Sequence, residues 1–582
     1  MTMSWKKLSL VMCLAVSLTS GCKTRDRPSA GPARSEGDWL LAHMLSDPEQ
    51  LNPLTSNDAG ASTVLGFIFQ SLLTRDPRTL ELKPLLAEAR PVISENKLTY
   101  TFKIRRDALF QDGRPLTGED VLFSLKAIKC PLVNAPFLRV YYDSVVDARL
   151  LDPFTIQFDT REPYFLNESV LGGIDVLPRH YYDPDDLLHN VTVPKLIGAE
   201  GSLSENVKRF AEQFNKNYTR KPLGSGPYRF FKWETGQEVI LERHDAYWGM
   251  GKEGIDQPHL YLFRFRIINN MDAALVSLKS GGLDFMSLQP LQYLRQTGSK
   301  RFESEFAKYV YFSPGYTYIG WNNAHPIFRD KRVRQAMTYL TNREQMVKTV
   351  LFGLGQVVDS PIYYFRPEYD RSLKSTPYDP QKALELLREA GWADTDGDGL
   401  LDNVIDGKKT PFRFEIKFNS GNSTRSSVAL TLQDELKRHG IAATVRQLDW
   451  TIFLDDVRNH KFDAMILGWS MSVNEPDAFQ VWHSSQAANN GSNMIGYNNP
   501  RVDKILEAYR REFDPGKRIA LYRAFQQILH DEQPYTFLFI GKAVSAVQRR
   551  FHGVEVLPSG GLRPIEWWVP LSEQKYTGRP EA

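Results

Sequence analysis

Apolar and polar residues alternate along the chain from Leu98 to Arg105. The apolar positions are Leu98, Tyr100, Phe102 and Ile104, and the residues between them are threonines and basic residues. A period of two turns successive side chains to opposite faces of a strand. The segment therefore predicts a half-buried strand with one face on a core and the other in water.

A helix is predicted soon after this strand. Asp112-Gly113 favours a turn, and Thr117 is followed three places later by Asp120, which is typical of a helix amino terminus. Apolar residues then recur at helical spacing, namely Val121, Leu122, Leu125 and Ile128. The pattern indicates a capped helix that packs one face against a core.

Strand-like and helical patterns alternate through the rest of the chain without a repeat of fixed period. Predicted strands lie on either side of a turn at residues 234–236, at residues 412–418 and at residues 535–540. Predicted helices occupy residues 61–70, 270–280, 380–390, 499–511 and 514–530. This alternation is typical of an α/β or α+β protein.

Length and charge limit the classes of function. The 582 residues exceed what one hydrophobic core usually holds, so two or three lobes are expected. The formal net charge is +3, from 72 Lys and Arg against 69 Asp and Glu. This near balance offers no basic stripe, and we expect no nucleic-acid partner.

The amino terminus has the pattern of an export signal. Two lysines precede an apolar run from Leu8 to Leu18, which is too short to remain as a membrane span. Cys22 follows small residues and resembles the acylated cysteine of a bacterial lipoprotein, with a soluble secreted form as the alternative. Residues 1–21 would then be a signal peptide, and residues 22–37 a flexible tether. Cys130 would remain as the only free thiol, most simply a buried one.

Motifs of common enzymes are absent from the sequence. There is no HExxH, Walker loop, GxSxG or CxxC, and the 11 histidines are scattered. Residues 249–254 fit GxGxxG, but Asp256 and Pro258 follow in place of a helix, which favours a surface turn. We therefore expect no enzymatic activity and no required cofactor.

One acidic segment has the spacing of a compact calcium loop. Asp394, Asp396 and Asp398 offer carboxylates at alternate positions beside glycines, and Asp402 is a further candidate ligand. Ile405 stands where an EF-hand has glutamate. The segment is interpreted either as a structural calcium site or as an acidic turn that joins a helix to the next strand.

Five blocks of sequence resemble those of one family and occur in its order. They are LNP at residues 51–53, FQDGRPLTGEDVLFSL ending at Leu125, GSGPY ending at Tyr228, AALVSLKSGGLDF ending at Phe285 and YDPQKALELLREAGW ending at Trp392. Together they resemble the extracellular solute-binding proteins of family 5, which serve ABC importers of peptides, nickel and some oligosaccharides.

The resemblance implies an α/β fold with mixed sheets, namely a two-lobed clamshell of the periplasmic-binding-protein kind with an inserted subdomain. The first lobe would contain residues 38–57, 221–312 and 541–578. The inserted subdomain would contain residues 65–217, and the second lobe residues 313–540. A ligand would be enclosed between lobes that close about a hinge.

The ligand site is expected in the loop from Ile466 to Ser485, which follows an apolar strand. Trp469 and Trp482 would offer flat surfaces for sugar rings or side chains. Asn52 and Tyr316 are further candidates.

Ser472 departs from the family pattern. In peptide-binding members of the family, the residue three places after the tryptophan that corresponds to Trp469 is commonly aspartate. This aspartate pairs with the amino terminus of the peptide. A serine hydroxyl cannot neutralise a buried ammonium group. Either Glu475 or Asp477 compensates from the same loop, or the ligand is neutral, such as an oligosaccharide or a blocked peptide.

The sequence is therefore interpreted as a monomeric substrate-binding lipoprotein of the cell envelope or periplasm. It would capture peptides and deliver them to an ABC permease in the membrane. Alternatives are a neutral ligand such as an oligosaccharide, a nickel complex, a secreted hydrolase and a receptor for signalling. The few histidines near the loop argue against nickel, and the lack of a nucleophile paired with a base argues against a hydrolase.

Overall fold

The computed structural model describes residues 36–56, 58–197, 203–471, 475–487, 492–576 and 578. The expected signal peptide, Cys22 and nearly all of the expected tether lie outside these residues, as does Ser472. Within the described part of the chain, no helix combines the length and apolar character needed to cross a membrane.

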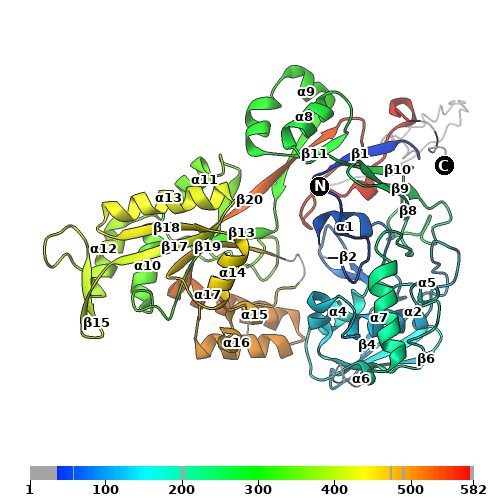
Figure 1. Cartoon of the computed structure of the whole chain (residues 1–582), viewed down its shortest axis with the longest axis horizontal. Helices are drawn as coiled ribbons and strands as arrows, with labels where there is room; N and C mark the ends of the chain where they lie inside the picture. The colour runs from blue at the N-terminus through cyan, green and yellow to red at the C-terminus, as the bar shows by residue number, and fades with distance from the viewer. Residues whose placement is uncertain are drawn as a thin grey trace, which may run out of the picture.

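A 12-stranded mixed sheet runs through both lobes (Figure 1). Its strands are β1 (Trp39–Met44), β8 (Tyr228–Glu234), β9 (Glu238–Arg243), β10 (Leu262–Ile267), β11 (Phe285–Leu288), β12 (Phe306–Phe312), β13 (Gly315–Trp321), β14 (Gly355–Val357), β17 (Arg413–Asn419), β18 (Ala442–Leu448), β19 (Ala464–Ser470) and β20 (Tyr535–Gln548). The main path is β18-β17-β19-β13-β20-β11-β1-β10-β9-β8, and β12 and β14 pair with β20 beside it.

Strand β20 belongs to both lobes. Its first half pairs with β13, from Tyr535 opposite Gly320 onward, and its second half pairs with β12 and β11. The strand predicted at residues 535–540 therefore continues to Gln548, because β11 and β12 form hydrogen bonds with β20 beyond the part that pairs with β13. The domain limits expected from the sequence stay predictions.

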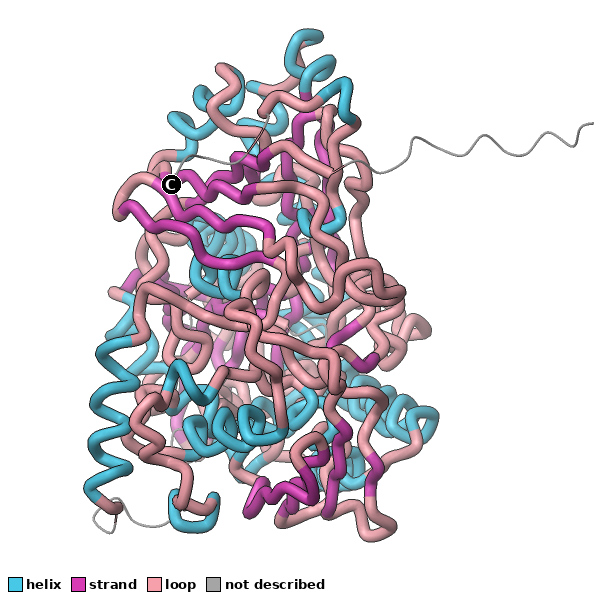
Figure 2. Tube along the Cα trace, turned by 90° about the vertical axis from the view of Figure 1, so that its right-hand side faces the viewer, coloured by secondary structure: helices cyan, strands magenta, loops and turns pink. Residues whose placement is uncertain are grey.

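The elements from β2 to α7, here called the insertion, share one hydrophobic core with the first lobe. The insertion contains β2 (Leu73–Arg75), β3 (Leu82–Pro84), β4 (Val92–Ile93), β5 (Thr99–Lys103), α2 (Gly118–Lys129), α3 (Pro136–Arg139), β6 (Val145–Asp152), β7 (Thr155–Thr160), α4 (Asn167–Gly172), α5 (Arg179–Tyr182), α6 (Val193–Leu196) and α7 (Glu205–Asn217). Strands β4-β5-β7-β6 form a four-stranded sheet, which lies at the lower end of the molecule in Figure 2. Helices α8 (Met271–Lys279) and α9 (Lys300–Glu305) lie beside the first lobe's strands at the opposite end.

The elements from β13 to α17 form the second lobe. Its helices are α10 (Lys331–Tyr339), α11 (Arg343–Thr349), α12 (Pro380–Glu389), α13 (Ser423–Arg438), α14 (Trp450–Arg458), α15 (Phe479–Trp482), α16 (Pro500–Arg511) and α17 (Pro515–Glu532). Strands β15 (Asp402–Ile405) and β16 (Lys408–Pro411) form a separate antiparallel hairpin. Ile466 and Leu538 face a core with α10, α12 and α13, whereas Leu467 and Phe537 face a second core with α14, α16 and α17. The sequences of β19 and of the first half of β20 are continuous apolar runs because both faces of these strands are buried.

Most of the predicted elements are confirmed. The alternating segment is β5, with Tyr100 and Phe102 fully buried, and the helix that follows is α2 with a capping box between Thr117 and Asp120. Residues 249–254 form the expected surface turn, in which Gly251 and Gly254 are exposed and have positive φ angles.

The prediction of a helix at residues 61–70 is wrong in its extent. Helix α1 runs only from Ala59 to Leu65. The carbonyls of Phe67 and Ile68 instead accept hydrogen bonds from Tyr228 and Gly226, at 3.2 and 2.7 Å. A Cβ at Gly226 would lie 2.4 Å from the Phe67 carbonyl oxygen, so the GSGPY block needs glycine for this close approach of two backbones.

Candidate functional site

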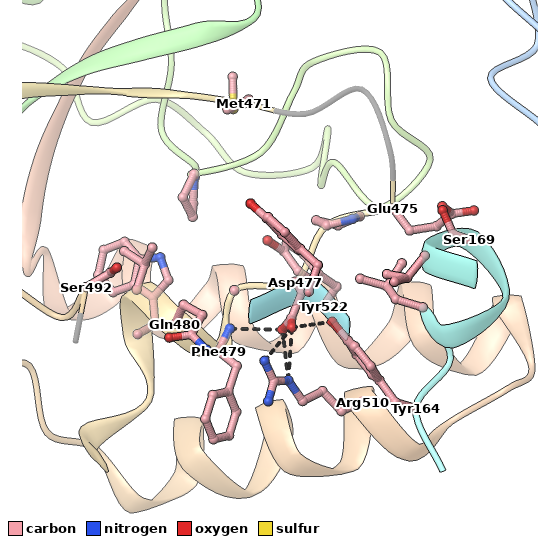
Figure 3. Close-up of a pocket in the computed structure, with 18 of the residues that line it drawn as sticks. Tyr164, Ser169, Met471, Glu475, Asp477, Phe479, Gln480, Ser492, Arg510 and Tyr522 are labelled. Carbon is pink, nitrogen blue, oxygen red and sulfur yellow. Dashed lines mark hydrogen bonds and ion pairs between the residues drawn. The ribbon is translucent and has the colours of Figure 1, made fainter. Parts of the chain in front are cut away.

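A cavity of about 1090 Å³ lies between the insertion and the second lobe. Residues within 137–144 and 162–170 line it from the insertion, and residues within 361–366, 469–471, 475–482 and 507–522 supply most of the facing wall. Figure 3 shows side chains that reach the cavity from the end of β19, from α15 and α16, and from the segment around α4. None of the described lining residues is His, Cys or Lys.

The structure brings five of the seven predicted ligand residues to this one cavity, namely Tyr316, Trp469, Glu475, Asp477 and Trp482. Asn52 is not among the lining residues. It is buried near the first lobe, where its side-chain oxygen accepts a hydrogen bond from the Leu54 backbone nitrogen at 3.0 Å and closes a turn. Ser472 lies outside the described residues.

Two paired strands position the aromatic part of the wall. Tyr316 on β13 is the register partner of Trp469 on β19. The indole nitrogen of Trp469 is buried and interacts with the hydroxyl of Tyr535, so the ring rather than the nitrogen is the part of Trp469 that can contact a ligand. Trp482 belongs mainly to the core, since it is 1% exposed and its ring lies 4.6 Å from that of Tyr535.

Asp477 is the centre of a hydrogen-bond network at the base of the cavity. Its carboxylate accepts bonds from the Tyr164 hydroxyl at 2.6 Å, from Nη2 and Nε of Arg510 at 2.6 and 2.9 Å, and from the Phe479 backbone nitrogen at 3.1 Å (Figure 3). Burial and the charge of Asp477 raise the pKa of Tyr164 far above its ordinary value, so its hydroxyl remains a donor. Tyr164 belongs to the insertion, and the network therefore joins the two walls.

Glu475 also joins the two walls. Its carboxylate accepts hydrogen bonds from both terminal nitrogens of Arg75, at the end of β2 in the insertion. Burial would raise the pKa of Glu475, but the charge and hydrogen bonds of Arg75 hold it below its ordinary value. Both predicted compensating carboxylates thus already have a guanidinium partner.

Phe165 connects the insertion to the core of the second lobe. Its side chain is 7% exposed and packs edge-on against Tyr509 with 4.9 Å between ring centroids. Its backbone nitrogen donates to the Arg510 carbonyl at 3.0 Å, and the Arg518 guanidinium lies 4.5 Å from the ring centroid. The walls are therefore in direct contact beside the cavity.

Four residues around the cavity were not predicted from the sequence, namely Arg75, Tyr164, Phe165 and Arg510. Arg75 and Glu475 are 400 residues apart, so no local pattern could pair them. The available signal for Tyr164 and Phe165 was an aromatic pair shortly after a strand. Arg510 lies in the last turn of α16, where helical periodicity marks only the buried face.

The predicted calcium ligands divide into two groups. Oxygen atoms of Asp394, Asp396 and Asp398 lie within 4.8 Å of one another, and all three residues are exposed. Asp402 is not part of this group, and its carboxylate accepts hydrogen bonds from Thr395 at 2.6 and 3.1 Å. Lys409 Nζ lies 2.7 Å from Asp396 and would compete with a cation.

Known proteins resemble this chain over nearly its whole length. The family model described as Bacterial extracellular solute-binding proteins, family 5 Middle, matches residues 81–491. The oligopeptide-binding protein AppA of Bacillus subtilis (strain 168) is 32% identical over 582 residues, covering 97% of this chain and 98% of that protein. The structure of AppA from Bacillus subtilis with a nonapeptide is 28% identical, with a TM-score of 0.68 and coverage of 92% and 99%. NikZ from Campylobacter jejuni with Ni(L-His) is 26% identical, with a TM-score of 0.69 and coverage of 91% and 99%.

Proposed function

The chain belongs to the bacterial extracellular solute-binding proteins of family 5, and from this we propose that it captures peptides in the cavity between the insertion and the second lobe. It would pass them unchanged to a permease of an ABC importer. The observation that carries the proposal is a cavity of about 1090 Å³ whose walls come from two bodies of the protein. That volume is at the upper end for small-molecule sites, which suits a ligand of several residues.

The experiment is identification of the bound solute. Protein purified without added ligand is denatured, and the released material is analysed by mass spectrometry. Calorimetric titration then compares peptides of two to nine residues with oligosaccharides of similar mass. Peptides in the released material and micromolar peptide binding support the proposal, whereas binding of sugars alone contradicts it. Turnover of the bound solute would contradict the proposed absence of bond chemistry.

A neutral ligand such as an oligosaccharide is the second candidate. It is favoured by the engagement of Glu475 with Arg75 and of Asp477 with Arg510, which leaves neither carboxylate without a cation. The exposed part of the Trp469 ring would then stack on a sugar. The same titration separates the two candidates.

We propose that the protein is exported and anchored through a lipid on Cys22. The family's extracellular character and the short apolar run before Cys22 support this proposal. Fractionation of cells that express the full chain should place it in the membrane fraction, and Cys22→Ala should move it to the soluble fraction. A monomeric mass in light scattering would support the proposed monomer.

We also propose that Asp394, Asp396 and Asp398 hold a structural calcium ion. Their clustered carboxylate oxygens support it, since calcium prefers oxygen ligands. Millimolar calcium should raise the melting temperature, and Asp398→Asn should abolish the rise. An unchanged melting temperature would favour the acidic turn.

A further inference from the structure

Glu475 is a cavity carboxylate whose cationic partner comes from the opposite wall. Nη1 of Arg75 lies 3.3 Å from Oε1, and Nη2 donates to Oε2. The side chains of Arg75 and Glu475 are 11% and 22% exposed. Figure 3 shows Glu475 at the edge of the cavity, beside Ser169 of the insertion. The pair is therefore shielded from water but adjacent to the space that a ligand would fill.

Arg75 has further partners in its own part of the chain. Nη1 donates to the Leu80 carbonyl at 2.9 Å, and Nη2 donates to the Ser169 hydroxyl at 3.1 Å. Both acceptors belong to the insertion. If Glu475 takes another cation, Arg75 keeps these hydrogen bonds, so its release costs less than leaving a bare guanidinium in a buried position.

Asp477 differs from Glu475 because its carboxylate accepts hydrogen bonds from two donors besides an arginine. Its two oxygens already accept bonds from Tyr164, Arg510 and the Phe479 backbone. The Arg510 guanidinium also lies 3.8 Å from the centroid of the Phe479 ring, within the same lobe. A carboxylate with this many donors has little capacity for an incoming ammonium group.

Other cations near Glu475 have carboxylates of their own. Arg366 forms hydrogen bonds of 2.9 and 3.0 Å to Glu368, and Arg90 forms bonds of 2.5 and 2.6 Å to Glu168. Arg75 is thus the cation whose guanidinium forms the ion pair with Glu475.

We propose that Arg75 determines specificity by occupying Glu475 in place of a ligand's ammonium group, so that a solute with a free amino group binds by displacing Arg75 from Glu475. This inference rests on the proposed function. The two cations compete for one carboxylate, and the strength of the internal pair therefore lowers the affinity for amines. A solute without an amino group leaves the pair intact.

The test uses two probes that differ only in this charge, pentaalanine with a free amino terminus and N-acetyl-pentaalanine. Calorimetry on the full chain gives the affinity ratio of the two peptides. Arg75→Gln should raise the affinity for the free amine about 10-fold, the lower range for a charge-assisted hydrogen bond, and change that for the acetylated peptide less than twofold. Glu475→Gln should bring the ratio of the affinities for the two peptides closer to one than it is in the wild type.

Arg114→Gln is the matched control, because Arg114 is an exposed arginine of the insertion whose nearest carboxylate is 4.0 Å away. It should leave both affinities unchanged. If Arg75→Gln shifts both peptides equally, or Glu475→Gln retains the wild-type ratio, the role of Arg75 is structural and the inference is overturned while peptide binding stands. If neither peptide nor any longer peptide binds the folded wild type, the proposed function falls and this inference with it.

Discussion

Phe165→Ala is expected to weaken the closed arrangement of the insertion and the second lobe. Phe165 lies in the insertion, yet its ring is 7% exposed and packs in the core that contains Tyr509 and Tyr522. Separation of the two bodies would bring this ring into water. The closed form therefore gains the burial of Phe165, and the open form does not.

The size of the effect follows from the contacts of the ring. Burial of a phenylalanine side chain is worth about 1.5–3 kcal/mol, and an edge-on aromatic pair adds about 0.5–1.5 kcal/mol. The backbone bond from Phe165 to the Arg510 carbonyl is unaffected by the substitution. A net loss of about 2–4 kcal/mol would shift the ratio of closed to open molecules by roughly 30-fold or more. The apparent ligand affinity falls by the same factor once the closed form is no longer dominant.

Small-angle scattering of ligand-free protein measures this shift as a larger radius of gyration, and calorimetry measures the lower affinity. Phe154→Ala is the control, since Phe154 is a partly exposed phenylalanine of the insertion that is not among the residues lining the cavity. Saturating ligand should return the Phe165→Ala protein to the wild-type radius. The reasoning is refuted if the substitution lowers the melting temperature but leaves both the radius and the affinity unchanged, because Phe165 would then be ordinary packing within one rigid body.

Three further predictions concern single side chains. Trp482→Ala should destabilise the second lobe by about 3–5 kcal/mol in urea unfolding, because the ring is 1% exposed; a loss below 1 kcal/mol would place Trp482 in the ligand wall rather than the core. Tyr164→Phe removes the hydroxyl that donates to Asp477 and should weaken ligand binding roughly 3- to 10-fold by calorimetry, with no effect expected if the walls do not act together. Burial raises the pKa of Asp175 to about 6, so its stabilising contribution is complete below about pH 4 and lost as the pH rises through 6. Asp175→Asn should therefore raise the free energy of unfolding relative to wild type at pH 7.5 more than at pH 4, and equal differences at both pH values would contradict this assignment.

Local patterns were sufficient for elements whose environment is set by near neighbours. The alternation at residues 98–105 predicted β5, and the Thr117 and Asp120 pair predicted the start of α2. The end of α1 was missed because it is decided by the backbone of Gly226 and Tyr228, more than 150 residues away. The continuation of β20 past Ile540 depends on β11 and β12 in the same way.

The candidate site shows the same division between local and distant information. The ligand loop was predicted from an apolar strand that runs into Gly468-Trp469, and four of the candidate residues predicted in it line the cavity. The facing wall was not predicted, since Tyr164 and Phe165 reach the loop only when the insertion packs against the second lobe. Residue type in one loop therefore located the site but did not describe its partners.

The charge preference of the cavity depends on these distant partners. From sequence, Ser472 left Glu475 and Asp477 as two equivalent replacements for a missing aspartate. The structure makes them unequal: Asp477 is bound by Arg510 of its own lobe, and Glu475 is bound by Arg75 of the insertion. A carboxylate held by a cation of its own lobe stays neutralised when the lobes separate, whereas one held by a cation of the insertion loses its partner at that moment. An amine bound at Glu475 would therefore have to keep Arg75 displaced when the lobes close, and closure would decide between the ligand and Arg75.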